Sequence, residues 1–184
     1  MKVNSPMRFT SFSICLFLAC GLLAFGADKD EKAQALAKLL VQDDDELPDG
    51  ITGGAAKTDQ KDAPPLFRKI PKAQVFATRP LEQEGEFKGS VTAFAYTSPA
   101  TRASVYKTFT TEMGDKSTKL EGIGEKGVMA ITVVDVAGLN YSIADVAFIR
   151  GNQVVFVRLM GKDPAEDAKA HAKRLDQRLK DAPK

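Results

Sequence analysis

The sequence predicts an α+β fold, with an antiparallel sheet of four to five strands and helices packed on one face. Apolar, β-branched segments lie close together near the end of the chain, and tight-turn dipeptides join them. Helix-type apolar periodicity precedes and follows these segments. Strands joined by tight turns must be antiparallel, and helices that are separate from such a sheet are typical of the α+β class.

The first 26 residues have the layout of a secretory signal peptide. Lys2 and Arg8 form a short basic region, an uncharged apolar stretch follows, and Ala24 and Gly26 precede the expected cleavage site. A membrane anchor is the alternative interpretation. The apolar residues 9–25 are short for a membrane span, which needs about 20 residues, so we expect cleavage and export.

Both cysteines, Cys15 and Cys20, lie in this leader, so a mature chain that begins at residue 27 contains none. Such a chain has no disulfide, no thiolate nucleophile and no cysteine metal site. Acylation at Cys20, as in a lipoprotein, is an alternative to removal of the whole leader. Contact with a membrane is expected only through the leader or through this acylation.

Loss of the leader also balances the charge. The full chain has 26 basic and 24 acidic residues, and loss of Lys2 and Arg8 leaves 24 of each. Nucleic-acid binding depends on a basic surface, so no nucleic acid is expected as a partner.

The mature chain begins with a predicted amphipathic helix over residues 27–46. Its apolar residues recur at i, i+3, i+4 and i+7, the spacing of one helical face. They are Ala33, Leu36, Ala37 and Leu40. Turn residues and a stretch without apolar periodicity follow, and they predict a flexible linker over residues 47–65. Residues 66–184 are the predicted α+β domain.

The domain is predicted to contain a strand and then a helix. Residues 87–98 combine apolar, small and threonine residues, as strands do. Ser98 is the predicted N-cap of the helix, Pro99 occupies its first turn, and Gly114 ends it. The predicted buried stripe consists of Ala103, Tyr106, Phe109 and Met113.

Three consecutive strands are predicted next, over residues 127–138, 141–150 and 153–160. Gly151-Asn152 between the last two is a hairpin-turn signal, so these strands are expected to form an antiparallel meander.

The chain is predicted to end in a helix with a capping box. Asp163 is the predicted N-cap, Pro164 lies in the first turn, and Glu166 is at the third helical position. The predicted buried face of this helix consists of Ala168, Ala172, Leu175 and Leu179.

Gly122, Gly124 and Gly127 have the G-x-G-x-x-G spacing of a dinucleotide-binding loop. This fingerprint needs a buried strand before the glycines and a helix after them, because the helix N-terminus binds the pyrophosphate. Here a polar segment precedes the glycines and β-branched residues follow them. Asp145 lies near where a ribose-binding acid would be expected, but the favoured interpretation is a turn that leads into a strand.

The sequence gives little support for a metal site or for a catalytic histidine. His171, the single histidine, lies on the flank of the last predicted helix, without a nucleophile or an H-E-x-x-H motif around it. The acidic residues 43–50 lack the spacing of an EF-hand loop. The sequence therefore predicts no catalytic residue, no metal ligand and no cofactor.

Two groups of charged residues suggest weaker hypotheses. Glu82, Glu84 and Glu86 alternate, so in an extended segment they would share one face. Paired carboxylates perform acid–base catalysis, whereas like charges on an exposed edge more often oppose aggregation. Arg150 and Arg158 would line an anion site if they faced the same way.

Three short segments resemble exported bacterial α+β modules of unknown function, which occur as lipoproteins and as extracytoplasmic parts of envelope or sensor proteins. The segments are ELPDGITGG at 46–54, LEGIGEKGVMA at 120–130 and VAFIRGNQVVFVRLMG at 146–161. The modules carry a D-L-P-x-G turn, a G-L-G-D-x-A stretch and a G-N-x-V-V hairpin. The chain departs from the second of these at Glu125, Lys126 and Gly127. The resemblance implies an envelope-located, non-catalytic role and supplies no catalytic residue.

We therefore expect a secreted or periplasmic, non-enzymatic domain. It would bind an envelope protein or a small hydrophobic or anionic ligand, on the open face of its sheet or between the sheet and the helices. A soluble part of an envelope complex is a further alternative, and it predicts an exposed apolar patch larger than a few hundred Å².

A small hydrolase of envelope polymers is the enzymatic alternative. Its acid–base residues would be carboxylates such as Glu82, Glu84, Asp135 and Asp145. Two carboxylates that face each other across a cleft, about 5 to 9.5 Å apart, would favour this hydrolase.

Overall fold

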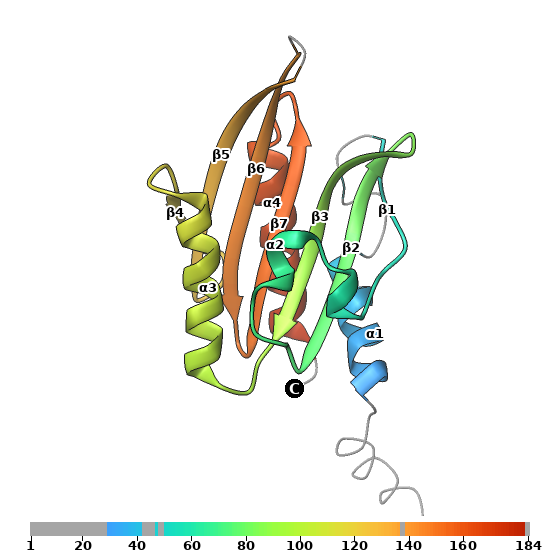
Figure 1. Cartoon of the computed structure of the whole chain (residues 1–184), viewed down its shortest axis with the longest axis vertical. Helices are drawn as coiled ribbons and strands as arrows, with labels where there is room; N and C mark the ends of the chain where they lie inside the picture. The colour runs from blue at the N-terminus through green and yellow to red at the C-terminus, as the bar shows by residue number, and fades with distance from the viewer. Residues whose placement is uncertain (1–28, 42–46, 48–49, 137–138, 183–184) are drawn as a thin grey trace, which may run out of the picture.

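The computed structural model of the chain describes residues 29–41, 47, 50–136 and 139–182. The predicted signal peptide, Cys20 and most of the acidic segment 43–50 lie outside these residues. Seven strands form one antiparallel sheet in the order β1-β2-β3-β7-β6-β5-β4 (Figure 1). The strands are β1 (Ile51–Gly53), β2 (Val75–Gln83), β3 (Glu86–Ala95), β4 (Thr118–Leu120), β5 (Lys126–Val136), β6 (Leu139–Arg150) and β7 (Gln153–Gly161). The helices are α1 (Lys29–Leu40), the 3-10 turn η2 (Gln60–Asp62), α2 (Pro65–Arg68), α3 (Pro99–Met113) and α4 (Ala165–Asp181).

The predicted α+β class is confirmed, but the sheet has seven strands where four to five were predicted. The additional strands β1 and β4 contain three residues each, too few to show an alternating pattern. The sequence of β2 contains Arg79 and Pro80, and a proline removes a backbone donor and weakens a strand signal.

The prediction of a flexible linker over residues 47–65 is wrong for its described part. Residues 51–53 pair with β2, and Lys57 forms an isolated bridge with Thr78. The side chain of Gln60 accepts a hydrogen bond from the backbone N–H of Ala73 at 2.8 Å. Hydrogen bonds to the backbone do not require apolar residues at regular spacing. The sequence of this segment therefore lacks apolar periodicity, although hydrogen bonds hold most of its described part against the sheet.

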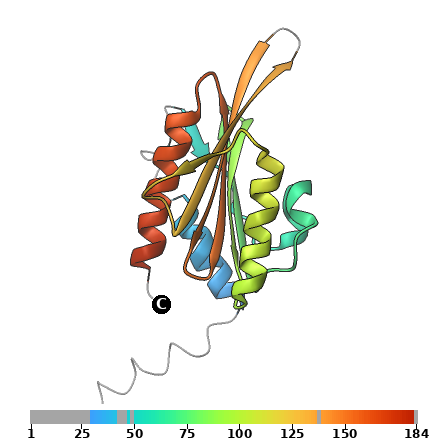
Figure 2. The same ribbon diagram turned by 90° about the vertical axis from the view of Figure 1, so that its left-hand side faces the viewer.

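The prediction that the helices pack on one face is also wrong, because helices cover both faces of the sheet (Figure 2). Helices α1 and α4 pack on one face, and α2 and α3 pack on the other. The reason lies in the central strands. Residues 154–157 of β7 are consecutive and all buried, so both faces of this strand need an apolar cover.

The core under α1 and α4 is mainly aliphatic, with Phe148 as its one buried aromatic ring among the described residues. Helix α1 buries the four residues predicted for its inner face, and α4 buries its predicted four together with His171 and Asp176. Arginine side chains hold the C-terminal end of α1: Arg79 donates from Nη1 to the carbonyl of Val41 at 2.6 Å, and Arg178 donates from Nη1 to the carbonyl of Leu39 at 2.7 Å. Positive charge at this end of a helix also complements its dipole.

The core under α2 and α3 is aromatic. Phe67 of α2 lies 5.5 Å from Phe94 and from Phe109 and 5.2 Å from Phe156, as measured between ring centroids. Tilted and edge-to-face contacts at these distances add to the stability that burial supplies. Four buried rings thus fasten α2 and α3 to β3 and β7.

The antiparallel meander β5–β6–β7 forms as predicted. Its register runs from Lys126↔Ile149 to Val136↔Leu139 in the first hairpin and from Ser142↔Gly161 to Arg150↔Gln153 in the second. Strands β5 and β6 project beyond the ends of α3 and α4 (Figures 1 and 2).

The helix boundaries agree with the sequence at α3 and differ at α4. Ser98 accepts the capping hydrogen bond from the backbone N–H of Thr101, and Gly114 follows the last turn. The buried stripe of α3 is shifted, because Val105 is buried and Ala103 is exposed. Helix α4 begins at Ala165 with Pro164 in the N-cap position and without a side-chain cap, so the capping box predicted at Asp163 and Glu166 is not formed.

Candidate binding surface

One face of the sheet is only partly covered by helices. Helices α2 and α3 lie over the lower part of β3, β7, β6 and β5 in Figure 1 and leave the upper part of these strands uncovered. The last row under the helices runs across five strands and consists of Val128, Ala147, Phe156, Thr92 and Thr78. In this row the hydroxyls of Thr78 and Thr92 lie 2.8 Å apart and hydrogen-bond to each other.

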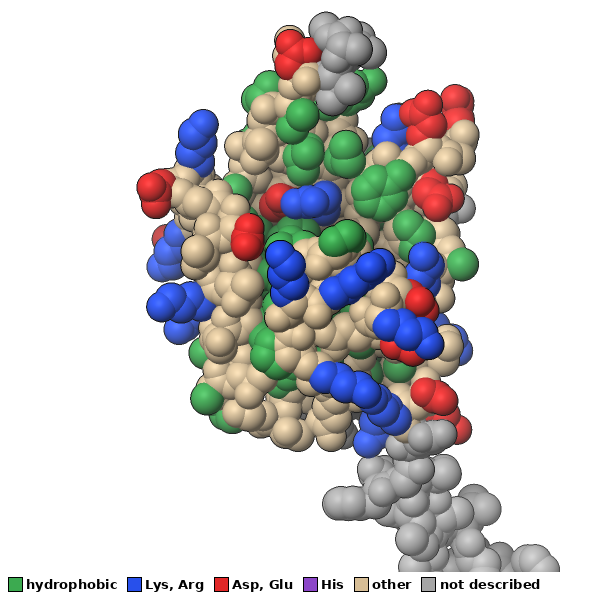
Figure 3. All heavy atoms as spheres, viewed as in Figure 1, with side chains coloured by type: hydrophobic (Ala, Val, Ile, Leu, Met, Phe, Trp, Pro, Cys, Tyr) green, Lys and Arg blue, Asp and Glu red, His purple; other side chains and the backbone are tan. Residues whose placement is uncertain are grey.

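Three further rows lie beyond it, and we call them the open face. The first row, which runs from β5 to β2, is Ala130, Asp145, Arg158, Ser90 and Pro80. The second row is Thr132, Ile143 and Met160, and the third is Val134 and Tyr141. Figure 3 shows this side of the molecule, with apolar side chains among charged ones over the upper part.

A bidentate ion pair lies in the middle of the first row. Arg158 donates from Nε and Nη2 to the two carboxylate oxygens of Asp145, each at 2.7 Å. The guanidinium also lies 5.5 Å from the centroid of the Phe156 ring. The hydrogen bond to Asp145 raises the pKa of Arg158, and burial opposes this shift. Two parallel hydrogen bonds hold the guanidinium and the carboxylate in a fixed orientation, and both groups are charged.

The rows beyond the ion pair are apolar and partly exposed. Ile143, Met160 and Val134 are half-buried, and the side chain of Tyr141 is 38% exposed. At the other end of the first row, a groove of about 450 Å³ runs between the segment 55–68 and strands β2 and β3. Ser90, Pro80 and Phe87 line it, and Phe87 is 53% exposed. Apolar side chains thus remain in contact with water on both sides of the ion pair.

The glycine motif lies elsewhere, in the connection between β4 and β5. Gly122 and Gly124 have positive φ angles of 74° and 66°, and strand β5 begins at Lys126. No helix follows the glycines, which confirms the interpretation of a turn that leads into a strand. The loop carries Ile123, whose side chain is 2% exposed and belongs to the core under α1 and α4.

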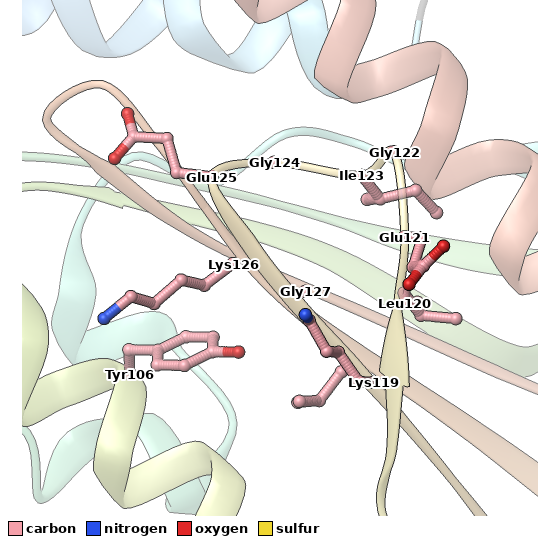
Figure 4. Close-up of a pocket in the computed structure, with 11 residues that line it drawn as sticks. Tyr106, Lys119, Leu120, Glu121, Gly122, Ile123, Gly124, Glu125, Lys126 and Gly127 are labelled. Atoms are coloured by element: carbon pink, nitrogen blue, oxygen red, sulfur yellow. The ribbon is translucent and has the colours of Figure 1, made fainter.

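The glycine loop borders a shallow cleft of about 660 Å³ (Figure 4). Lys119 and Lys126 reach it from β4 and β5, Tyr106 reaches it from α3, and burial raises the pKa of Tyr106. Glu125 turns away from Tyr106, and its Oε1 accepts a hydrogen bond from the backbone N–H of Gly151 at 2.9 Å. The loop therefore connects β5 to the β6–β7 turn by a hydrogen bond and places Ile123 in the core. These structural roles explain the glycines of the loop without a bound nucleotide.

His171 is buried and has no catalytic geometry. It is 2% exposed on the inner side of α4, and neither ring nitrogen makes a hydrogen bond of ordinary geometry. Burial, and to a smaller extent the charge of nearby Arg174, lower the pKa of His171 to about 4, while the backbone of Leu40 opposes the shift. The ring is therefore neutral at pH 7 and serves as a core residue.

The structure separates the charged residues that the sequence grouped. Glu82 lies in β2, Glu84 has a φ of 53° in the turn, and Glu86 begins β3, so a hairpin reverses the chain between them. They do not form the single face predicted for an extended segment.

Arg150 and Arg158 face opposite sides of the sheet, so the condition for a shared anion site is not met. Arg150 binds both carboxylate oxygens of Asp176 at 2.6 Å on the α4 side, whereas Arg158 lies on the open face. In the part of the chain that the structure describes, no group of three or more histidine, cysteine, aspartate or glutamate side chains is placed to hold a metal ion. No described helix is long and apolar enough to span a membrane.

Comparison with known proteins adds evidence on the fold. No protein-family model matches the chain, and no curated protein matches it. Among solved structures, the extracellular domain of PknH from Mycobacterium tuberculosis is similar, with a TM-score of 0.54 and 11% sequence identity. The similarity covers 82% of this chain and 97% of that domain. The chain therefore shares the fold of an extracellular domain, at an identity that carries no residue roles across.

Proposed function

We propose that the protein is an exported, non-enzymatic domain that binds a partner or ligand on the open face. The observation that carries this proposal is the arrangement of that face, where partly exposed apolar rows adjoin a fixed Arg158–Asp145 pair. Binding surfaces typically combine apolar contact area with a few placed polar groups that fix orientation.

The ion pair has unused hydrogen-bonding capacity. Arg158 uses Nε and one N–H of Nη2 on Asp145, and Nη1 makes no hydrogen bond within the described residues. Its side chain is 35% exposed. A guanidinium held by a carboxylate on one edge presents its other edge in a fixed direction, which suits a carbonyl or carboxylate of a bound partner.

The arrangement of the carboxylates supports a non-enzymatic role. Asp135 and Asp145 alternate to opposite faces of the sheet, because they lie on paired strands at positions of opposite parity. Asp145 in β6 and Glu82 in β2 are three strand spacings apart, or about 14 Å, which exceeds the separation used by glycosidases. Asp145 is also held by Arg158.

Export is supported by the leader sequence and by the fold. The first 26 residues have the layout of a signal peptide, and the mature chain contains no cysteine. The similar solved structure is an extracellular domain. We infer that the open face meets its partner outside the cytoplasm, in the envelope or beyond it.

A capture experiment tests the proposed function. The chain from residue 27 onward would be immobilised and exposed to an envelope extract of the source organism, and the bound material would be quantified by mass spectrometry. Ile143→Glu and Tyr141→Ser change the open face, and Ala170→Glu changes an exposed position of α4 as the matched control. Circular dichroism would establish that each variant is folded.

The expected result is that the same captured species fall at least about tenfold for both open-face variants, since each loses apolar contact area at a binding surface. The same species are retained by Ala170→Glu. Equal capture by all four proteins would contradict the proposal and would favour another surface.

A further inference from the structure

The cleft beside the glycine loop contains hydrogen-bond donors from three elements. Lys119 lies in β4, Lys126 begins β5, and Tyr106 belongs to α3. The register pairs Lys119 with Val128, and Lys126 precedes Val128 by two residues, so the two lysines are diagonal neighbours on one face of the sheet. Backbone positions of this kind lie about 7 Å apart, within the reach of two long side chains for one ligand. Figure 4 shows both lysine side chains directed toward the side of the cleft where Tyr106 lies.

No carboxylate of the described residues neutralises these two lysines. Neither ammonium group forms an ion pair there. Glu125 accepts the hydrogen bond from Gly151 and turns away from Tyr106, and Glu121 lies on the far side of Lys119 in Figure 4. Two like charges on neighbouring strands repel each other, and an anion bound between them would replace this repulsion by attraction.

The other side chains of the cleft add a neutral donor and apolar walls. The hydroxyl of Tyr106 makes no hydrogen bond within the described residues. Burial raises the pKa of Tyr106, so its hydroxyl stays protonated at pH 7 and is able to donate. The ring of Tyr106 and the side chain of Val128 are half-buried and pack against the aromatic core. The cleft therefore offers positive charge and a hydroxyl donor beside apolar surface.

We propose that this cleft binds a phosphate monoester, with Lys119 and Lys126 facing its charged oxygens and Tyr106 donating to a third oxygen. A phosphate monoester carries nearly two negative charges at pH 7 and has three strong acceptor oxygens. Two ammonium groups and one hydroxyl match this charge and this number of acceptors. A carboxylate carries one charge and would leave one lysine without an anion. Lysine is also a common phosphate ligand, which binds as a point charge.

Side chains would hold this phosphate, in contrast to a dinucleotide loop, where a helix N-terminus does so. Strand β5 follows the glycines, so the helix that the fingerprint needs is absent here. The cleft volume of about 660 Å³ leaves room for the group that is esterified to the phosphate, beside Tyr106 and Val128. That group belongs either to a small soluble molecule or to a phospholipid. The cleft lies apart from the open face, so the proposal does not depend on the proposed function.

A titration with phenyl phosphate tests the proposal. Amide chemical shifts of the isotope-labelled chain from residue 27 onward would be followed at constant ionic strength. We expect saturable shifts in residues 119–128, with a Kd of about 1 mM or below. Benzoate has the same ring and one charge, so its affinity is expected to be at least about tenfold lower. Equal affinities for phenyl phosphate and benzoate would contradict the match of two charges.

Variants of the three donors localise the binding. Lys119→Gln and Lys126→Gln are each expected to weaken phenyl phosphate about fivefold, and the double variant about twentyfold or more, since each removes one charge that faces the ligand. Tyr106→Phe keeps the ring and is expected to cost about threefold. Lys173→Gln removes the same charge from an exposed position of α4 and is expected to bind like the unmodified chain. Circular dichroism would establish that each variant is folded.

Vesicles distinguish the two sources of the phosphate. Co-sedimentation with phosphatidylcholine vesicles that contain phosphatidic acid, but not with pure phosphatidylcholine, would identify a lipid headgroup if the double lysine variant loses it. Binding of phenyl phosphate without vesicle binding would identify a soluble monoester, and either result supports the proposal. Failure to bind either probe, or equal binding by the double lysine variant and the unmodified chain, would overturn it.

Discussion

At the scale of single residues, His171 shows how burial changes chemistry. A lone histidine among charged residues is an obvious candidate for catalysis, and the sequence placed it on the flank of the last helix. The structure buries it between α4 and the end of α1, and neither nitrogen makes a hydrogen bond of ordinary geometry. Burial lowers its pKa to about 4, so charging it works against the folded state.

The first prediction concerns the pH dependence of stability. The unfolded chain binds a proton at His171 near pH 6.5, whereas the folded chain does so near pH 4. The unfolded state therefore holds more protons between these values, and the free energy of unfolding is expected to fall by about 3 kcal/mol as the pH is lowered through this window.

Urea unfolding at several pH values between 7 and 4 would measure this effect against His171→Leu. The variant removes the titrating group and the two unsatisfied nitrogens, so its stability at pH 7 is expected to be equal or higher. The difference between the two proteins isolates His171, because the other titrating groups are common to both. Parallel pH curves would show that His171 is not the source.

At the scale of elements, the glycine loop between β4 and β5 shows why a motif needs its structural context. Its spacing matches a nucleotide-binding fingerprint, yet strand β5 follows where a helix would be required. The glycines are needed instead for positive φ angles and for a close approach to the neighbouring strand. A Cβ on Gly124 would lie 2.5 Å from the carbonyl oxygen of Ile149, while a Cβ on Gly122 would meet no atom within 4 Å.

The second prediction compares alanine at these two positions. Both glycines have positive φ angles, so each alanine is expected to cost about 1 kcal/mol of folding stability. Gly124→Ala adds the clash with β6, and its total is expected to reach about 3 kcal/mol or more. Denaturant unfolding of the two variants measures the difference. Equal losses would mean that the loop is free to move away from β6.

Much of the fold could be predicted from local pattern. The inner face of α1, the capped start of α3 and the β5–β6–β7 meander each have a periodic or turn signal within about a dozen residues. The remaining parts depend on distant partners. Gln60 binds the backbone of Ala73, and no local pattern encodes such a contact. The consecutive buried residues 154–157 did contain a signal for helices on both faces.

The candidate site was less accessible to sequence reasoning. Asp145 and Arg158 stand 13 residues apart and meet only because the β6–β7 register places them opposite each other. Once the Gly151-Asn152 turn is recognised, counting outward along both strands brings these two residues together. The boundary of α2 and α3, which leaves the open face uncovered, has no comparable local signal.

At the scale of the whole molecule, the sheet has two parts with different surroundings. Its lower part is a core with helices on both faces, and its upper part carries the open face and the projecting β5–β6 hairpin (Figures 1 and 2). Strands are stiff and hold side chains in fixed register, so a surface built on them is ordered before a partner arrives. The helix-covered half would thus hold in place the half that we propose as the binding surface.

Site-specific photo-cross-linking in the producing cells tests whether the open face contacts a partner. Benzoylphenylalanine at Tyr141 places the probe on the open face, and at Lys173 it places the probe on the exposed side of α4. We expect discrete adducts after irradiation of the Tyr141 protein, their loss when Ile143→Glu is added, and no adducts at Lys173. Adducts of equal yield at both positions, or adducts only at Lys173, would contradict this expectation.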